Sequence, residues 1–501
     1  MAVQDAEPKQ HSSGLNKGAI STFGIVILVL AAASPLIGLT GAMPLSMLTG
    51  TGLGAPGAYV VVGVILLVFS VGFVALSHHV RNAGALYAYV GRGLGLPMGL
   101  GAAGLALWAY TTIQVAVYAF FGVVASGTLS YYTGIELPWY VLSIALIVLV
   151  QIFGYLHLEI GARVLLVLMA LEWGIMLLMA LVIAIKGGAG EGFAVADVWS
   201  PSAVFAPANV ELGLGGIAVA MIWAFASMFG FESSAIYGEE AKDPKKSVSR
   251  AAVISVITIT LFFAFTGWMA IVGYGPSKAM DAVVASVVDS GDPAQYIFAL
   301  GDMYLGSWAP VLMSLFVITS MFACVLAFHN GIVRYQYRLG ADGVLPKALS
   351  RTRQNGAPHV SSIVQCITAL IFIIIAVIVN ADPVLVLFTW GGGIAVIGVI
   401  ALYILTSISI IVFFRKNKNL NSNIFTTLLI PIVGLVLLLI AEYLMLQNFY
   451  ILLGFTPEQS GNALLIAATC ILAFAIGLVL WGVRRSSMSK DALKDLEEEI
   501  T

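Results

Sequence analysis

Apolar and polar residues follow one another along this chain in long blocks rather than in alternation. Twelve blocks stay apolar over the length of a helix, and each is bounded by charged residues or by glycine and proline; they are residues 20–48, 55–77, 97–126, 137–156, 163–185, 212–236, 250–274, 306–333, 360–380, 384–413, 425–446 and 463–483. About 20 apolar residues in a helix cross the hydrocarbon of a bilayer. Membrane β-barrel strands are about half as long and alternate in polarity. The pattern therefore predicts 12 transmembrane helices.

The composition agrees with this pattern and narrows the class of protein. Of the 501 residues, 60% are hydrophobic and 10% are charged. A soluble protein carries about 25% charged residues, so the sequence excludes a soluble enzyme, a nucleic-acid-binding protein and a disordered scaffold. Cys324, Cys366 and Cys470 lie inside apolar blocks, without the spacing of a disulfide framework or a zinc site. We expect an all-α integral membrane protein that needs no metal and no cofactor.

The positions of the basic residues predict how the helices are oriented. With 12 spans, all of the 23 lysines and arginines except Lys186 and Lys278 fall on the side that holds both chain ends. Basic residues concentrate on the cytoplasmic side of membrane proteins. We therefore expect a multi-pass protein of the plasma membrane (the cell's inner membrane) with both termini in the cytoplasm. The opposite loops are acidic, which either favours cationic or zwitterionic solutes or is ordinary solvated charge.

Two of the blocks contain helix breakers near their centres. Residues 34–41 of the first read Ser-Pro-Leu-Ile-Gly-Leu-Thr-Gly, and residues 227–234 of the sixth read Ser-Met-Phe-Gly-Phe-Glu-Ser-Ser. Proline and glycine free backbone amides and carbonyls, which hydrocarbon tolerates only where they line a cavity or bind a ligand. Matched interruptions in two halves of a chain indicate a binding site. The alternative is that these glycines serve only close helix packing.

The order of the spans relates the two interruptions by inversion. The first and sixth spans cross the membrane in opposite directions, so spans 1–5 and 6–10 form two inverted repeats. The predicted parts are a cytoplasmic tail at 1–19, repeats at 20–186 and 212–413, two peripheral helices at 425–483 and a second cytoplasmic tail at 486–501. The start of a half-helix favours a carboxylate, and freed carbonyls favour an ammonium group. The polarity indicates an amino-acid-like solute.

Three stretches of the chain resemble motifs of the amino acid–polyamine–organocation (APC) superfamily of transporters. They are residues 229–232 with 239–246, residues 82–90, and Arg334 with residues 340–346. The resemblance implies a LeuT-type fold, in which a 5+5 inverted repeat and two further helices give 12 transmembrane helices, and transport by alternating access. The chain departs from the family where its first break is spread over Pro35, Gly38 and Gly41, and where Ala85 replaces a glycine.

The resemblance also assigns binding residues by position. It places the substrate carboxylate at the first interruption and the amino group at the second; the expected residues are Ser34, Ile37, Gly38, Thr40, Gly41, Phe229, Gly230, Phe231 and Ser233. Along the third span, Tyr110, Gln114 and Tyr118 recur every four residues and so share one helix face. We add Gln114 to the expected binding residues; packing of satisfied polar groups is the alternative.

Three glutamates lie inside predicted spans, where an unpaired charge costs about 3 kcal/mol. Glu232 lies at the second interruption and is expected to act in gating, or only to hold the broken backbone together. Glu172 lies near the middle of the fifth span and is a candidate for binding the coupling proton; a structural hydrogen bond is the alternative. Glu442 lies near one end of the eleventh span and is expected to reach the interface or a neighbouring helix.

These observations predict a secondary active transporter of an amino acid or a related amine, with proton-coupled uptake. An exchanger of amino acids or polyamines is the alternative, and a channel fits less well because no selectivity filter or charged ring is evident. No zinc-protease His-Glu-x-x-His motif and no phosphate-binding loop occurs in the sequence, so an enzyme or an ATP-driven pump is not expected. The expected partners are the small-molecule substrate, a proton and membrane lipid, and no nucleic acid.

Overall fold

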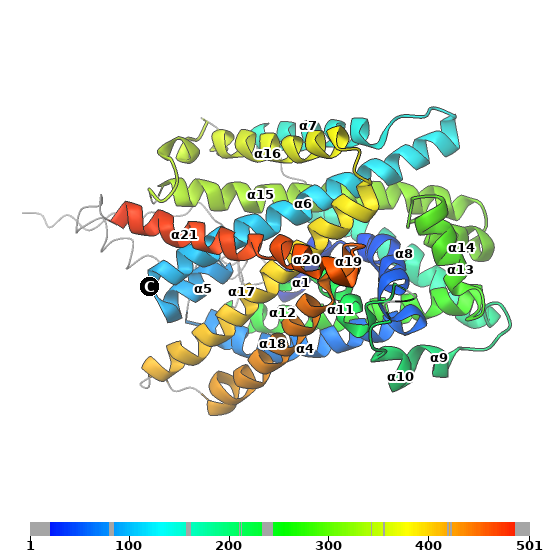
Figure 1. The fold of residues 1–501 in the computed structure, drawn as a ribbon, viewed down its shortest axis with the longest axis horizontal. Helices are drawn as coiled ribbons and strands as arrows, with labels where there is room; N and C mark the ends of the chain where they lie inside the picture. Colours follow the sequence, from blue (N-terminus) through cyan, green and yellow to red (C-terminus); the bar gives the residue numbers. More distant parts are fainter. Residues whose placement is uncertain are drawn as a thin grey trace, which may run out of the picture.

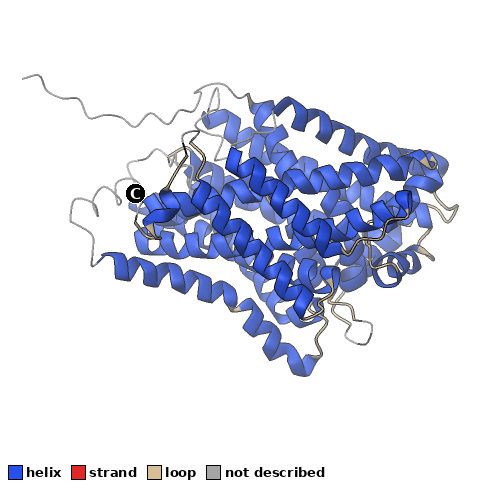
Figure 2. Ribbon diagram, turned by 90° about the horizontal axis from the view of Figure 1, so that it is seen from above, coloured by secondary structure: helices blue, strands red, loops and turns tan. Residues whose placement is uncertain are grey.

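The computed structural model describes residues 21–79, 85–156, 162–209, 211, 213–232, 244–341, 343–353, 356–417, 420 and 423–485. Within these ranges the chain is helical apart from its connections, and the pairing of Asn209 with Leu214 is an isolated bridge (Figure 2). The predicted all-α class is therefore confirmed. Ser233 and the two predicted tails, 1–19 and 486–501, lie outside the described residues.

Ten helices of the described chain are long and apolar enough to cross a membrane. They are Pro35–Ser77, Leu96–Thr133, Trp139–Leu156, Leu166–Lys186, Lys246–Tyr274, Trp308–Ala341, His359–Ile378, Pro383–Lys416, Phe425–Gln447 and Pro457–Val483. The number differs from the predicted 12 at the two interrupted blocks. The span counted from Pro35 to Ser77 joins the first and second blocks across a kink at Gly50 and Gly52, and the sixth block holds only the 12-residue helix α11 (Gly216–Ser227).

The first block is broken where the sequence predicted it. Helix α1 (Thr22–Ala33) ends at Ser34, whose φ of 43° is left-handed, and α2 (Pro35–Ile37) begins anew. Proline at the start of a helix fits because it lacks the N–H that would be left without a partner. The π-helical turn η1 (Gly38–Ala42) follows directly. A left-handed serine is a strained conformation that is common at ligand sites.

The second break ends α11 at Ser227. Residues 228–230 form a turn, and the φ of 106° at Gly230 lies in a region that side chains disfavour. Phe231 and Glu232 are 3-10 helical, and the next α-helix within the described residues is α12 (Pro244–Tyr274). Both breaks therefore expose helix ends in the interior of the protein.

The other elements complete a bundle around these two breaks (Figure 1). The long helix α6 (Leu96–Thr133) packs against α15 (Trp308–Ala341), α17 (Thr389–Lys416) and α21 (Thr469–Arg485), and α7 (Trp139–Leu156) packs against α16 (His359–Ile378). The remaining helices are α3 (Met43–Ser46), α4 (Ala55–Ser77), α5 (Ala85–Leu94), α8 (Ala162–Lys186), α9 (Val195–Trp199), α10 (Pro201–Val204), α13 (Ala279–Val284), α14 (Gln295–Leu305), α18 (Ile430–Gln447), α19 (Phe449–Leu452) and α20 (Ser460–Ala467). Further π-helical or 3-10 turns are η2 (Met47–Thr51), η3 (Gly52–Gly54), η6 (Ala285–Asp289), η7 (Lys347–Ser350), η8 (Pro383–Phe388), η9 (Phe425–Leu429) and η10 (Pro457–Gln459).

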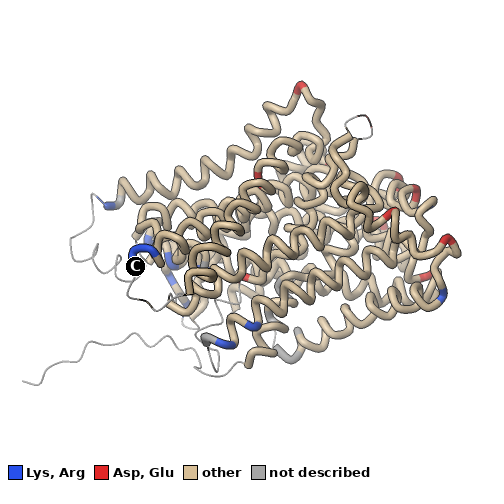
Figure 3. Tube along the Cα trace, turned by 90° about the horizontal axis from the view of Figure 1, so that it is seen from below, with Lys and Arg blue, Asp and Glu red and all other residues tan. Residues whose placement is uncertain are grey.

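Charge separates the two ends of the bundle. In Figure 3 most lysines and arginines of the described chain gather at one end of the bundle, and aspartates and glutamates predominate at the other. At the acidic end, the Glu191 carboxylate accepts hydrogen bonds from the hydroxyl and the amide of Ser277, at 2.6 and 3.2 Å, and these bonds lower the pKa of Glu191. The bonds connect the loop after α8 to the loop after α12.

Candidate substrate-binding site

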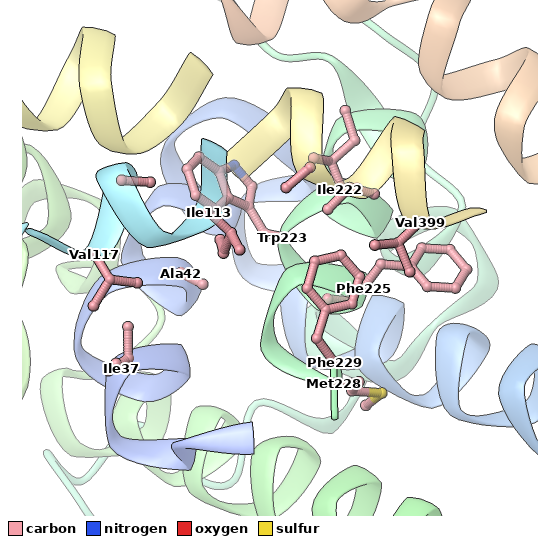
Figure 4. Close-up of a cluster of buried hydrophobic side chains, with 14 of the residues drawn as sticks. Ile37, Ala42, Ile113, Val117, Ile222, Trp223, Phe225, Met228, Phe229 and Val399 are labelled. Atoms are coloured by element: carbon pink, nitrogen blue, oxygen red, sulfur yellow. The ribbon is translucent and has the colours of Figure 1, made fainter. Parts of the chain in front are cut away.

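A buried cavity lies where the two broken helices meet. It encloses about 500 Å³ of space that protein atoms do not fill, part of it open to the surroundings, and five segments supply its walls. The lining residues are Ala33, Ser34, Ile37, Gly38, Ala42, Ile113, Val117, Trp223, Ala226, Ser227, Phe229, Cys324, Phe328, Phe388 and Gly392. In Figure 4, Ile37, Ala42 and Val117 lie opposite Phe229, and Ile113 lies beside Trp223. The wall is mostly apolar and carries no charged side chain among the described residues.

The first break contributes Ser34, Ile37 and Gly38 to the wall, as the sequence predicted for the site. The start of a helix carries a partial positive charge that attracts anions. At the start of α2, Pro35 has no amide, and the Ile37 and Gly38 amides bond the carbonyls of Ser34 and Pro35. Thr40 and Gly41 lie elsewhere: the Thr40 hydroxyl donates to the carbonyl of Leu36 at 2.7 Å, and Gly41 faces Phe120. The start of α2 is thus suited to hold a carboxylate.

The second break contributes Phe229 and, beyond the prediction, Trp223, Ala226 and Ser227. The Ser227 hydroxyl donates to the Trp223 carbonyl at 2.8 Å and contacts the Tyr59 hydroxyl at 3.2 Å. The last turn of α11 presents carbonyl groups without helical partners, which attract positive charge. The end of α11 is thus suited to an ammonium group.

Gly230 and Phe231, two other predicted binding residues, do not line the cavity. Gly230 makes the turn after α11, and Phe231 is fully buried in an aromatic cluster, with its ring centroid 5.7 Å from that of Tyr403 and 6.1 Å from that of Phe69. Their place in the structure is to shape the break rather than to contact the cavity.

Glu232 connects the second break to α17 by hydrogen bonds. Its Oε2 atom accepts hydrogen bonds from the backbone amide of Gly230 at 3.1 Å and from the hydroxyl of Tyr403 at 3.0 Å, and its side chain is buried. The sequence placed Glu232 at the break but gave no indication of Tyr403, which lies 171 residues further along the chain. The carboxylate fixes the backbone where α11 ends.

Replacing Glu232 with alanine is expected to lower the stability of the purified protein. The buried Tyr403 hydroxyl would lose its acceptor, and a buried polar group without a partner costs about 1–3 kcal/mol. Thermal unfolding in detergent measures the change, with Glu232→Gln as the control because glutamine still offers an oxygen acceptor to Tyr403. An unchanged unfolding temperature for Glu232→Ala would contradict this role.

Glu172 is connected to the cavity by two serines. Its Oε2 accepts a hydrogen bond from the Ser320 hydroxyl at 3.0 Å, and the Ser320 and Ser34 hydroxyls lie 2.7 Å apart. All three side chains are buried, and Ser34 lines the cavity. Helices α8 and α15 thus connect the Glu172 carboxyl group, through two hydrogen bonds, to Ser34 in the cavity wall. The sequence singled out Glu172 but not Ser320, a small polar residue in an otherwise apolar block.

Gln114 belongs to a separate polar network between α6, α15 and α16. Its amide donates to the Val325 carbonyl at 3.1 Å, and its oxygen accepts a hydrogen bond from Gln365 at 2.7 Å. It does not line the cavity; the neighbouring positions Ile113 and Val117, which lie four residues apart, do. The polar stripe and the cavity wall are therefore adjacent faces of one helix.

Aromatic side chains lie together in and beside the cavity wall. The Phe120 and Phe388 rings stack with centroids 4.6 Å apart, and Phe388 lies 5.8 Å from Trp223. The Trp223 indole donates to the Thr49 hydroxyl at 3.0 Å. The sequence did not identify the three aromatic residues because they come from three different blocks and are ordinary apolar residues within each.

Gly38 permits the close approach of the two breaks, and Gly38→Ala is expected to destabilise the protein. A Cβ atom there would lie 2.9 Å from the Cβ of Ser227 and would overlap the ring of Phe263. Such overpacking costs about 1–3 kcal/mol. The matched control is Gly392→Ala in the same cavity wall, where a Cβ meets no atom within 4 Å. Equal unfolding temperatures for the two variants would contradict the argument.

Long apolar helices around a cavity at which two broken helices meet are typical of a multi-pass membrane transport protein. Comparison with known proteins identifies the family: residues 24–490 match the family described as amino acid permease, and the chain belongs to it. The protein is therefore a transporter and not an enzyme. The predicted membership of the APC superfamily is confirmed.

Three individual relatives share 26–30% of their aligned residues with this chain. An uncharacterized transporter of Mycobacterium bovis is 26% identical over 414 residues, covering 76% of this chain and 78% of the relative. An amino-acid permease of Bacillus subtilis is 27% identical over 314 residues, covering 60% of this chain and 62% of the relative. A branched-chain amino acid permease of Lactococcus lactis is 30% identical over 158 residues, covering 30% and 31% of the two chains.

Proposed function

We propose that this protein takes up amino acids with apolar side chains across the plasma membrane, driven by a proton gradient. The observation that carries the proposal is the cavity between the broken helices: a helix start on one side, a helix end on the other, and an apolar wall between them. The two helix ends complement the carboxylate and the ammonium group of an amino acid. Ile37, Ile113 and Val117 would contact its side chain.

The chemistry of the wall favours an amino acid over a polyamine. A polyamine carries several positive charges and no carboxylate, so a site for it needs several negative groups. The wall offers two serine hydroxyls, backbone groups and apolar side chains. The relative named as a branched-chain amino acid permease supports the same choice of substrate class.

The proposal includes the inverted arrangement of the chain. The repeats at 20–186 and 212–413 would each begin with one of the two broken helices, α1–α2 and α11, and the helices at 425–483 would lie outside the ten-helix core. Adding α11 as a span and separating α4 from the first block gives the 12 transmembrane helices of a LeuT-type fold. The basic end of the bundle would face the cytoplasm and carry both termini, in accord with the usual distribution of charge.

Lipid contact follows from the same placement in the membrane. Large apolar side chains on the outside of α7, α8 and α16 are exposed, among them Val148, Leu181 and Ile371. An exposed apolar surface of this kind is unfavourable in water and suits hydrocarbon. The substrate, a proton and membrane lipid are thus the proposed partners.

Uptake by the purified protein in liposomes tests the proposal. Radiolabelled leucine is expected to accumulate with saturation when the outside is more acidic than the inside, and to accumulate much less without the gradient; lysine and spermidine are expected to compete poorly. Uptake that needs internal amino acid but no gradient would instead show the exchanger. Non-saturating flux would show a channel, and the absence of amino acid uptake would contradict the proposal.

A further inference from the structure

We propose that the hydrogen-bond chain from Glu172 through Ser320 to Ser34 reverses its direction when Glu172 binds a proton, and that this reversal prepares Ser34 to bind the substrate carboxylate. The inference rests on the proposed function and specifies how proton and substrate are coupled. Its basis is the pair of contacts of 3.0 and 2.7 Å that join the three side chains.

Counting hydrogens fixes the direction of the chain when Glu172 is ionised. A serine hydroxyl has one hydrogen to donate and lone pairs that accept. Ser320 donates its hydrogen to the Glu172 carboxylate. The contact between the two serines then requires Ser34 to donate to Ser320. In this state Ser34 turns only lone pairs toward the cavity, and these repel a carboxylate.

Protonation of Glu172 permits the opposite order. The carboxylic acid donates to the Ser320 oxygen, Ser320 donates its own hydrogen to the Ser34 oxygen, and the Ser34 hydrogen is free to point into the cavity. One proton binds at Glu172, both serines keep their own hydrogens, and no bond other than the new O–H bond is formed. Ser34 then donates to the substrate carboxylate beside the first turn of α2.

The reversal can affect substrate binding because Ser34 borders the cavity. Ser34 lines the cavity, is buried, and holds the left-handed conformation that separates α1 from α2. Its hydroxyl does not cap α2. The Ser34 hydroxyl therefore contacts Ser320 on one side and borders the cavity on the other. Helix α15 packs against α1, α2 and α8, which keeps the three residues together.

Other titratable groups lie away from this chain. Helices α1 and α2 have none in their sequences, and on α15 Cys324 lies four residues beyond Ser320 while His329 contacts Ser362 of α16 at 3.0 Å. Lys186 ends α8 and donates to the carbonyl of Tyr304. The remaining titratable residues of α8, α12, α14 and α15 lie in the first or last two turns of those helices: Arg163, Lys245, Lys246, Arg250, Tyr274, Tyr296, Asp302, Tyr304, Arg334, Tyr335, Tyr337 and Arg338. Glu172 is thus the carboxyl group that the two serine hydrogen bonds connect to the cavity.

The pH dependence of leucine binding tests the inference. Wild-type protein is expected to bind radiolabelled leucine about tenfold more tightly in acidic (about pH 5.5) than in alkaline (about pH 8.5) buffer. Ser320→Ala, which removes the oxygen that accepts the Ser34 hydrogen and so interrupts the chain, is expected to bind leucine with the same affinity at both pH values. Ser320→Thr restores a hydroxyl and is expected to restore the difference. Thr319→Ala is the matched control, because the Thr319 hydroxyl bonds the Phe316 carbonyl within its own helix.

The outcomes separate this inference from the proposed function. Wild-type and Ser320→Ala proteins with the same pH dependence of binding would overturn the serine chain while leaving amino acid transport intact. Wild-type protein that binds no amino acid at either pH would overturn both. Should Ser320→Ala not yield folded protein, Ser34→Ala interrupts the same chain at the cavity, and its pH dependence is judged by the same criterion.

Discussion

Glu172→Gln is expected to abolish the accumulation of leucine that a proton gradient drives, while exchange of leucine across the membrane continues. Glutamine keeps the size of the side chain, and its NH2 group can donate to Ser320 as the protonated acid does, but it cannot gain or lose a proton. The substrate would still bind, because the helix ends of α2 and α11 are unchanged. Accumulation under an inward proton gradient is expected to fall about tenfold or more, to the level seen without a gradient.

Glu442→Gln is the control for this experiment. Glu442 is another glutamate within a predicted transmembrane helix, but it lies on α18, outside the cavity wall, and its Oε2 has no hydrogen-bond partner. Gradient-driven accumulation should therefore persist in Glu442→Gln. Accumulation by Glu172→Gln at the wild-type rate would remove Glu172 from the coupling mechanism, and equal losses in both variants would indicate a general loss of folding.

Val117→Trp is expected to block transport by filling the cavity. Val117 is buried in the cavity wall, opposite Phe229, and an indole in place of the isopropyl group would occupy the volume that the substrate needs. Saturable leucine uptake is expected to disappear. The matched control, Val148→Trp, makes the same exchange on α7 at a side chain that is 54% exposed on the outside of the bundle. Uptake by Val117→Trp equal to that of the control would show that substrate passes elsewhere.

The uninterrupted helices were predictable from sequence because charges and glycines bound each apolar run. The predicted span 55–77 coincides with α4 (Ala55–Ser77), and 163–185 differs from α8 (Ala162–Lys186) by one residue at each end. The positions of the two breaks were predictable for a related reason. Proline and a left-handed glycine leave a local signature that does not depend on neighbouring helices.

The walls of the cavity were less predictable, because they depend on how helices are rotated in the bundle. Ile113 and Val117 are apolar residues in an apolar helix, and nothing in the sequence distinguishes them from residues that face lipid. Gln114 was chosen because it is polar, yet that polarity is satisfied by Gln365 of α16. Polar character alone does not separate a binding residue from one that joins two helices.

Glu172 shows what the sequence can predict about the site and what it cannot. Its type and its depth in the predicted span singled out Glu172 in the sequence, because a carboxyl group is energetically unfavourable in hydrocarbon and is rare there without a functional or structural role. Its partner Ser320 lies 148 residues away and resembles any small residue of a transmembrane helix. Tertiary packing alone brings Ser320 between Glu172 and Ser34.

The most direct measurement of the proposed site is an electron cryo-microscopy map of the protein with saturating leucine. We expect substrate density in the cavity, with the carboxylate beside Ser34 and the start of α2, and the ammonium group at the carbonyl end of α11 near Ser227. The side chain should lie against Ile113 and Val117. An empty cavity under conditions where leucine binding is saturated, or leucine density elsewhere in the bundle, would contradict the assignment.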